Sequence, residues 1–503
     1  MGGGLIESRL NDIKTNIRHI FNDITDIYGE FFYGFDIDLN ESDPNSVITY
    51  IGKNRSYKPA HMDFTNDVFD YGDWGDAWFI KNIKVVALNT SGEIICELDK
   101  DDYTKDVNGN DVSNIIDRNN VFVIFPKIYV LTTYTGDGKY RFCFVKSTGF
   151  IEKYYCWEDE TYKGIDGHYY NYMYMGVYDT YVDRSTNKLC SYSGKSLTDD
   201  TTEMTFPFYR SCAKHIDGND DDSLYDVESY QKHMLINLLL LLIGKSTDTQ
   251  AVFGNGKKMQ SIYSTNVLRT GTMDDKGLFW GTNSDDTKGV KIFGIENWWG
   301  NLGHIVTECI RYVEEEGFPI YGRPDYIQYD DDSAVAVSYM FHANDIYPYP
   351  IFDNEEEIND FEDMYTNMLN DESDYIYEVW NSNGYIWEGK SCKWCKVDDS
   401  VGYIAPNFGI DYYNQYFPDQ YRLTPPTNGD GSKWDGAELY LLRFGDAYQL
   451  NNGQQVDHCG AFALGDISIA YIRRDSTANW FKYRSHWWNS HITYLSDELI
   501  YAD

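Results

Sequence analysis

One short stretch constrains the fold more than any other part of the chain. Residues 294–301 read GIENWWGN, with two adjacent tryptophans enclosed by two glycines. Glycine lets the backbone approach another segment closely and adopt positive φ angles. Glu296, Asn297 and Asn301 can bond backbone groups that a tight turn leaves unpaired. Because large aromatic rings mainly serve packing, the stretch predicts a buried crossing point of the chain.

The same residues carry a resemblance to a known family. The stretch resembles the GxxNxWGNxW core of the C-type-lectin-like, or sulfatase-modifying-factor-like, fold in the version found in many bacteriophage fibre and tail proteins. Gly303 stands where the family pattern ends in tryptophan. The matching positions, which the resemblance makes the structural core motif, are Gly294, Asn297, Trp298, Trp299, Gly300 and Asn301.

Other segments match the same phage proteins in the same order along the chain. Phe206–Ser211 resembles the strand that opens the lectin-like domain, and Leu235–Thr249 resembles its long helix. The remaining matches are Ser42–Pro44, Val47–Tyr50, Pro59–Ala60, Phe69–Gly72, Gln250, Phe253–Gly256, Gly271–Gly277, Phe279–Gly281, Asn451–Val456 and Cys459–Ala461. The resemblance implies an amino-terminal module followed by a lectin-like domain.

The start of the chain shows the heptad pattern of a coiled coil, with apolar residues at alternating spacings of four and three. These residues are Ile6, Leu10, Ile13, Ile17, Ile20, Ile24 and Ile27. Isoleucine at both heptad positions favours three strands or more over two. We therefore expect a parallel homotrimer through residues 5–28, with a dimer as the second choice. The alternatives are a helix packed on its own domain or docked on another virion protein.

Tyrosine and acidic side chains dominate the composition. The chain has 503 residues, 45 of them tyrosine, and a formal net charge of −38. Tyrosine favours strands and interfaces, whereas nucleic-acid binding needs clustered lysine and arginine. We expect no nucleic-acid partner and no membrane insertion, because the longest apolar run, Met234–Ile243, is too short to cross a bilayer. The start lacks a signal peptide, which predicts assembly in a host cytoplasm.

These patterns predict an α+β chain of four parts. The parts are a coiled-coil helix over 1–30, a β-rich module over 31–135, a tyrosine-rich β connector over 136–205, and a C-type-lectin-like domain over 206–503 with an acidic insertion at 351–400. Apolar and β-branched runs predict strands at 83–88, 121–125, 139–146 and 169–178. Helical spacing predicts a helix at 353–374. The long helix that the resemblance implies is expected over 226–244, ended by Gly244, and a further helix is expected near 111–117.

No specific catalytic pattern is visible in the sequence, so we expect no enzyme, no metal and no cofactor. Cys392 and Cys395 lack the second pair of a zinc ribbon. Formylglycine-generating enzymes, which share the fold, use two copper-binding cysteines, whereas only Cys459 lies in the comparable region here. His486 and His491 have no partner at metal-ligand spacing.

Calcium is the one alternative to the absence of a cofactor. Two acidic clusters match part of a calcium-loop pattern, although the full twelve-residue pattern is missing. They are Asp106, Asn108, Asn110 and Asp117, and Asp217, Asn219, Asp221 and Asp222. Because the full pattern is missing, a solvated turn is the favoured interpretation of each cluster.

The segment 480–489 mixes aromatic rings with polar side chains, a composition suited to recognition. In the phage proteins that the chain resembles, this final part of the fold forms the binding face, although the rings can instead close the core, as we expect for Trp480 and Trp488. The expected receptor contacts are Tyr483, Arg484, His486, Trp487 and Asn489.

The leading interpretation is a bacteriophage virion protein, a tail or head fibre, that displays a lectin-like domain for host attachment. Its partners would be itself, other virion proteins, and a glycan or protein on the host surface. The alternatives are a structural virion component without a receptor and a glycan depolymerase that uses two carboxylates.

Overall fold

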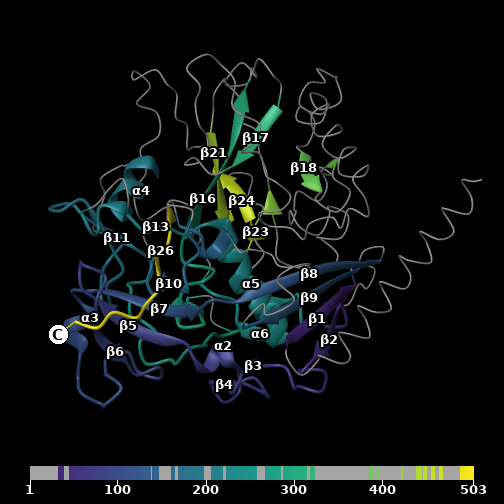
Figure 1. The fold of residues 1–503 in the computed structure, drawn as a ribbon, viewed down its shortest axis with the longest axis horizontal. Coiled ribbons are helices and arrows are strands. Elements are labelled where there is room, and N and C mark those ends of the chain that lie inside the picture. Colours follow the sequence, from purple (N-terminus) through teal and green to yellow (C-terminus); the bar gives the residue numbers. More distant parts are fainter. Residues whose placement is uncertain are drawn as a thin grey trace, which may run out of the picture.

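The structure is a computed structural model (Figure 1). It describes residues 32–38, 45–136, 139–146, 160–164, 168–197, 206–218, 223–257, 267–284, 287–313, 318–322, 385–388, 393–396, 421–422, 438–443, 446–449, 455–458, 464–467 and 488–502. The predicted coiled coil over 5–28 and the predicted acidic helix over 353–374 lie outside these residues.

A six-stranded antiparallel sheet forms the centre of the fold, in the order β13-β26-β10-β7-β5-β6 (Figure 1). Its strands are β5 (Lys84–Leu88), β6 (Ile94–Leu98), β7 (Asn120–Pro126), β10 (Tyr172–Gly176), β13 (Tyr225–Val227) and β26 (Ile492–Ser496). The sheet therefore joins strands from the segments 31–135, 136–205 and 206–503. The strands predicted at 83–88, 121–125 and 169–178 are confirmed as β5, β7 and β10.

Strand β7 shows why this sheet is buried on both faces. Its sequence NVFVIFP is rich in β-branched and aromatic residues, which favour strands. Alternate side chains point to opposite faces, so Val121 and Val123 pack in the core that contains helix α5 (Tyr230–Gly244). Phe122 and Ile124 pack in a second core on the other face. The unbroken apolar run from Val121 to Pro126 is what a strand covered on both faces requires.

A second sheet has four antiparallel strands in the order β2-β1-β9-β8. They are β1 (Tyr33–Asp38), β2 (Ile48–Gly52), β8 (Tyr129–Gly136) and β9 (Lys139–Val145), the last of which confirms the strand predicted at 139–146. Asp36 of β1 faces Arg141 of β9 and accepts two hydrogen bonds from its guanidinium, at 2.7 and 2.9 Å. This paired geometry fixes the register of the two strands.

Helix α5 (Tyr230–Gly244) lies in the core between the sheets (Figure 1). Ser229 caps its first turn by accepting a hydrogen bond from the Lys232 backbone N–H, and Lys245 ends it in the left-handed conformation. Every residue from 235 to 243 is at most 2% exposed, as expected for a helix that is apolar on all sides. The helix predicted over 226–244 is confirmed, with its start at 230.

Helix α4 (Phe206–Lys214) corrects one expectation, because 206–211 was predicted to be a strand. Tyr209, Cys212 and Ala213 are buried in the core that faces α4, at the spacing of one helical face. Pro207 near the start is compatible with the first turn of a helix. The strand that precedes α5 is instead β13.

Short elements connect these layers. They are β3 (His61–Asp63), β4 (Val68–Asp70), α2 (Trp78–Lys81), α3 (Ser113–Ile116), the 3-10 helix η2 (Glu160–Tyr162), β11 (Tyr181–Asp183), β12 (Lys188–Cys190), α6 (Thr249–Phe253), β14 (Lys291–Ile292) and β15 (Ile295–Glu296). Helix α3 confirms the helix predicted near 111–117.

A third sheet runs in the order β17-β16-β21-β24-β20, with β25 pairing β16 in parallel. Its strands are β16 (Gly303–Val313), β17 (Phe318–Gly322), β20 (Tyr421–Arg422), β21 (Glu438–Arg443), β24 (Leu464–Ile467) and β25 (Trp488–Asn489). Two hairpins pair β18 (Tyr385–Glu388) with β19 (Lys393–Lys396), and β22 (Asp446–Gln449) with β23 (Gln455–His458).

The described residues contain both helices and strands, with more strand than helix, as expected of an α+β or a β-rich fold. Within them, no helix is long and apolar enough to cross a membrane.

Candidate functional site

The two tryptophans of the GIENWWGN stretch join it to the rest of the core. Trp298 and Trp299 are each 1% exposed. The indole of Trp298 donates a hydrogen bond to the Asn237 side chain of α5 at 3.0 Å, and that of Trp299 donates to the Gly254 carbonyl at 3.0 Å. The predicted burial of this crossing point is confirmed.

The two glycines of the stretch are required by close contacts as well as by conformation. Gly294 has a φ of 89°, and a Cβ atom there would lie 2.6 Å from the Tyr103 hydroxyl. Gly300 has a φ of 81°, and a Cβ atom there would lie 2.6 Å from the Lys257 backbone nitrogen. Other residues at these positions would be strained and would also collide with their neighbours.

The two asparagines of the stretch aim their side chains at one carboxylate. Asn297 and Asn301 have positive φ angles of 55° and 69°, a conformation that asparagine tolerates better than most residues. The Nδ2 atom of each donates a hydrogen bond of 2.9 Å to the same oxygen, Oδ2 of Asp179. The tight turn therefore presents two amide donors to a residue far away in the sequence.

The other oxygen of Asp179 faces a histidine. Nε2 of His304 lies 2.6 Å from Oδ1 of Asp179, and both side chains are fully buried. Burial by itself raises the pKa of the Asp179 carboxyl, but the hydrogen bond from His304 and the nearby histidine charges outweigh burial and lower that pKa. These contacts therefore favour the ionised form of the Asp179 carboxyl inside the protein.

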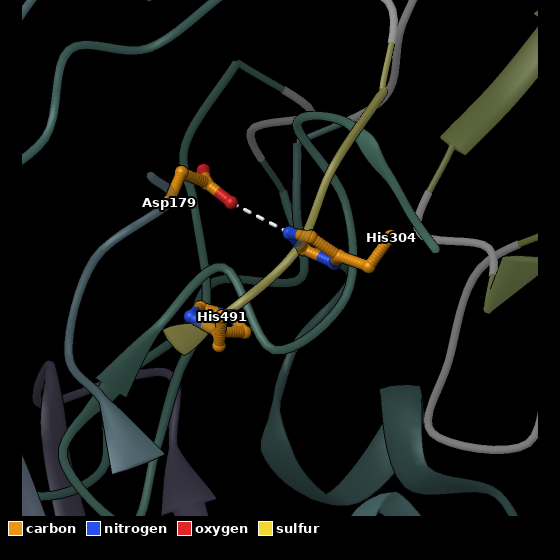
Figure 2. Close-up of side chains that lie close together, drawn as sticks. All are labelled: Asp179, His304 and His491. Carbon is orange, nitrogen blue, oxygen red and sulfur yellow. Dashed lines mark hydrogen bonds and ion pairs between the residues drawn. The ribbon is translucent and has the colours of Figure 1, made fainter. Parts of the chain in front are cut away.

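A second histidine completes the group (Figure 2). The His491 ring centre lies 4.9 Å from that of His304 and 6.1 Å from that of Trp298. Asp179, His304 and His491 each offer one possible ligand atom, and these three atoms lie within 4.8 Å of one another. All three residues are buried. Two imidazoles and a carboxylate so arranged can hold either a buried proton or a metal cation.

Three separate segments bring these side chains together. Asp179 lies in the loop between β10 and β11, His304 at the start of β16, and His491 directly before β26. Gly303 and His304 of β16 pair with β25, two residues before His491. The site is therefore located where the end of the chain returns to the central sheet.

Asn489 fixes the loop that carries Asp179. Its Oδ1 accepts hydrogen bonds from the Thr180 backbone N–H at 2.6 Å and from the Ser490 N–H at 2.8 Å. Its Nδ2 donates to the Thr180 carbonyl at 2.7 Å. One side chain thus ties the residue next to Asp179 to the segment that carries His491.

This geometry corrects one predicted receptor contact. Asn489 is 0% exposed, and both polar atoms of its amide bond groups of the protein interior. A side chain that is bonded in this way does not reach a receptor. The other expected receptor contacts, Tyr483, Arg484, His486 and Trp487, lie outside the described residues.

The histidine group continues toward helix α5. The His233 ring stacks on Trp298 with 5.2 Å between ring centres. Asn237 bonds Nε2 of His233 at 2.8 Å and also accepts from the Trp298 indole. Glu228 lies 3.5 Å from Nδ1 of His233. The tryptophan of the core motif is therefore in contact with histidines of two distant segments.

A second buried polar network lies beside the motif and was not expected. Glu296, 0% exposed, accepts hydrogen bonds from the backbone N–H groups of Gly271 and Met273 at 2.9 and 2.8 Å. Lys291 donates to the Met273 carbonyl at 2.7 Å and lies 3.6 Å from the Tyr103 ring centre. These bonds hold the loop 271–273 against the motif.

Burial governs the charges of this second network. It raises the pKa of Glu296 and lowers that of Lys291. Asp274, whose pKa burial also raises, accepts hydrogen bonds from Tyr178 at 2.5 Å and from Ser193 at 2.6 Å. Each carboxyl accepts hydrogen bonds from backbone N–H or hydroxyl groups. The network therefore packs the loop that contains residues 271–274.

The predicted calcium clusters have other uses in the described residues. Asp106 accepts hydrogen bonds from the backbone N–H groups of Asn108 and Asn110 and from the Asn110 side chain, each at 2.8 Å. These bonds close the predicted turn, in which Gly109 has a φ of 82°. Asp217 accepts from the Ser223 hydroxyl at 3.0 Å, and residues 219–222 lie outside the described residues.

Part of the site is predictable from the sequence. Asn297, Asn301 and His491 were singled out, but Asp179 and His304 were not, and no partner was expected for His491. His304 follows the motif by three positions, which was the one local signal. Asp179 and His304 are 125 positions apart, so no spacing pattern connects them.

A scan against models of known protein families finds no match for this chain, and a search of curated proteins finds no matching sequence.

Proposed function

We propose that the protein is a bacteriophage virion appendage, a fibre of the tail or head, that displays a lectin-like domain for attachment to the host surface. The observation that carries this proposal is the buried GIENWWGN turn. The residues that carry the resemblance bond distant parts of the core. Asn297 and Asn301 donate hydrogen bonds to Asp179, and Trp298 donates one to helix α5. A motif with such specific internal partners is a better guide to fold than composition alone.

A second observation supports the same proposal. Helix α5 covers most of the segment that resembles the long helix of the phage domain, and α6 with Gly254 follows it as the resemblance implies. The Gly254 carbonyl accepts a hydrogen bond from the Trp299 indole. Three segments of the resemblance are therefore in direct contact, although fold alone does not carry function.

The proposed host contact is the segment 483–487. Tyr483, Arg484, His486 and Trp487 remain the candidates after the correction of Asn489. They directly precede strand β25, whose Asn489 is fixed in the core. A rigid anchor beside a recognition segment reduces the entropy lost on binding.

Attachment tests this proposal directly. Fluorescently labelled full-length protein is mixed with a panel of bacterial isolates, and cell-bound fluorescence is measured. We expect binding to some isolates and at least a tenfold loss in the variant Y483A/R484A/W487A, because aromatic and arginine contacts carry most binding energy. The variant Y501A is the control, since Tyr501 is also a tyrosine, is 52% exposed, and follows β26 in the sequence, whereas residues 483–487 precede it.

Each other outcome identifies a rival function. Release of soluble sugars from capsule by the purified protein indicates a depolymerase. A folded protein that binds no isolate but is found in purified particles indicates a structural component. Unchanged binding by a folded triple variant moves the contact away from 483–487.

A further inference from the structure

The buried group of Asp179, His304 and His491 has the dimensions of a metal site (Figure 2). Its ligand atoms lie within 4.8 Å of one another. Metal bonds to histidine nitrogen and carboxylate oxygen are about 2.0–2.2 Å long, so two ligands of one ion are separated by about 4 Å or less. The ligand atoms therefore need to move by no more than several tenths of an ångström.

We propose that Asp179, His304 and His491 bind a divalent transition-metal ion, and that zinc is the ion they match best. Imidazole nitrogen is a good ligand for zinc and its neighbours, whereas calcium and magnesium prefer sites made of oxygen. Two imidazoles with one carboxylate therefore select zinc over the alkaline-earth ions. This site differs from both acidic clusters that the sequence offered for calcium.

The hydrogen bonds around Asp179 are those that a metal ligand needs. Asn297 and Asn301 both bond Oδ2, which leaves Oδ1 directed at His304. Carboxylates that bind metals are usually oriented by such outer hydrogen bonds. Amide donors do not titrate, so they hold the carboxylate in place at any pH at which the protein folds.

The charge of the site also favours a cation. Asp179 is fully buried, and an isolated carboxylate in the interior is strongly disfavoured. Histidine binds a metal through a neutral ring, so a protonated His304 or His491 must release one proton before it can share a divalent ion with the carboxylate, whereas a neutral His304 keeps its single proton on Nδ1. Metal binding then releases protons and weakens in acid.

The ion would act as a structural link. Its three ligands come from the loop after β10, from β16 and from the residue before β26. Binding would tie the end of the chain to the central sheet and to the third sheet. Because such a site exists only in the folded chain, the ion stabilises the fold. This inference does not depend on the proposed host attachment.

Metal binding by the full-length protein tests the inference. The protein is stripped with a chelator, dialysed and titrated with zinc chloride in a calorimeter, and bound zinc is counted by mass spectrometry. We expect one tightly bound zinc per chain and a rise in melting temperature of a few degrees, with no such rise in calcium chloride. Less than one tight zinc per chain, or an equal response to calcium, overturns the inference.

Two variants locate the ion. H304Q and H491Q each remove one ligand, and we expect zinc affinity to fall by more than the roughly 10- to 100-fold that loss of an outer hydrogen-bond partner costs. The control is H168Q, because Nε2 of His168 lies 2.7 Å from Asp497 at the surface, in a pair exposed by 54% and 42%. Unchanged zinc binding in folded H304Q and H491Q overturns the inference.

A spectroscopic measurement on the wild-type chain covers the case in which a variant does not fold. Cobalt(II) replaces zinc, and the chain is labelled with nitrogen-15 at histidine. We expect visible absorption bands and large paramagnetic shifts for two of the ten histidines. Cobalt that shifts no buried histidine overturns the inference.

Discussion

A buried carboxylate is stable only where other groups replace the water that it loses. Asp179 receives two amide hydrogen bonds on one oxygen and a histidine on the other. The acid, its two asparagines and its histidine are all at most 1% exposed. At the scale of single residues, this set is the most demanding part of the structure, because removal of one member leaves the others buried without compensation.

The lowered pKa of Asp179 predicts acid sensitivity. A carboxyl whose pKa is lower in the folded than in the unfolded chain contributes stability above its unfolded pKa of about 3.9, and loses it as pH falls through the folded value. We expect D179N, with chelator present, to be about 3 kcal/mol less stable at pH 6 and to lose less stability between pH 5 and about 2.

Urea unfolding across this pH range measures the effect. The matched control is D76N, because the Asp76 side chain is 92% exposed and its removal takes away one charge without opening the core. If D179N and the wild-type chain lose stability in parallel on acidification, the carboxyl of Asp179 is not the group that titrates.

The Asn489 amide gives a second prediction at this scale. N489A leaves the backbone N–H and C=O of Thr180 without their side-chain partner. Each unsatisfied buried group costs about 1–3 kcal/mol, so we expect a loss of about 2 kcal/mol or more. N283A is the control, since Asn283 lies in an exposed loop. Equal unfolding free energies for the two variants would contradict the role assigned to Asn489.

At the scale of elements, the GIENWWGN turn acts as a connector between layers. Its backbone has positive φ at Gly294, Asn297, Gly300 and Asn301. Trp298 bonds helix α5, Trp299 bonds the Gly254 carbonyl after α6, and the two asparagines bond Asp179. The turn itself forms only the short strand β15, paired with β14. Its order comes from side-chain hydrogen bonds and close packing.

A comparison of two glycines separates conformation from packing in this turn. Gly294 and Gly109 have φ angles of 89° and 82°, so alanine costs about 1–2 kcal/mol of backbone strain at either position. A Cβ atom at Gly109 meets nothing within 4 Å, whereas one at Gly294 lies 2.6 Å from the Tyr103 hydroxyl. We expect G294A to be less stable than G109A by about 1–3 kcal/mol, as measured by chemical unfolding. Equal losses would mean that the core around Tyr103 adjusts freely.

Local patterns predicted those elements whose cause is local. Helix α5 is an apolar run ended near Gly244, and β7 is a β-branched run. A strand was expected at 206–211 because this segment resembles the strand that opens the lectin-like domain, whereas the structure forms helix α4 and buries Cys212 and Ala213 on its apolar face. The Asp179 site depends on contacts between distant segments, which no spacing rule reveals.

At the scale of the whole molecule, the chain closes on itself. Strand β26, near the carboxyl end, lies between β13 and β10 in the central sheet, and Ile94 of β6 pairs with Tyr501 (Figure 1). The central sheet consequently depends on segments that are far apart in sequence. Long-range pairing of this kind slows folding, and a metal ion at Asp179, His304 and His491 would secure the carboxyl-terminal segment against the rest of the fold.

Assembly is the final prediction, and it rests on the sequence of residues 5–28. Leu10, Ile17 and Ile24 occupy one heptad position, and isoleucines occupy the other, a pattern that favours three strands or more. A helix of this length is marginal alone in water and gains stability from partners. We therefore expect the full chain to be a homotrimer, with a mass three times the 58.4 kDa of one chain, and a chain that begins at residue 30 to be a monomer. Light scattering coupled to size-exclusion chromatography measures both masses. A measured mass of two chains would favour the dimer, which is the second choice, over the trimer. A monomeric full chain would rule out self-assembly through this helix, and a trimer that survives the deletion would assign the contact to the β-rich part of the molecule.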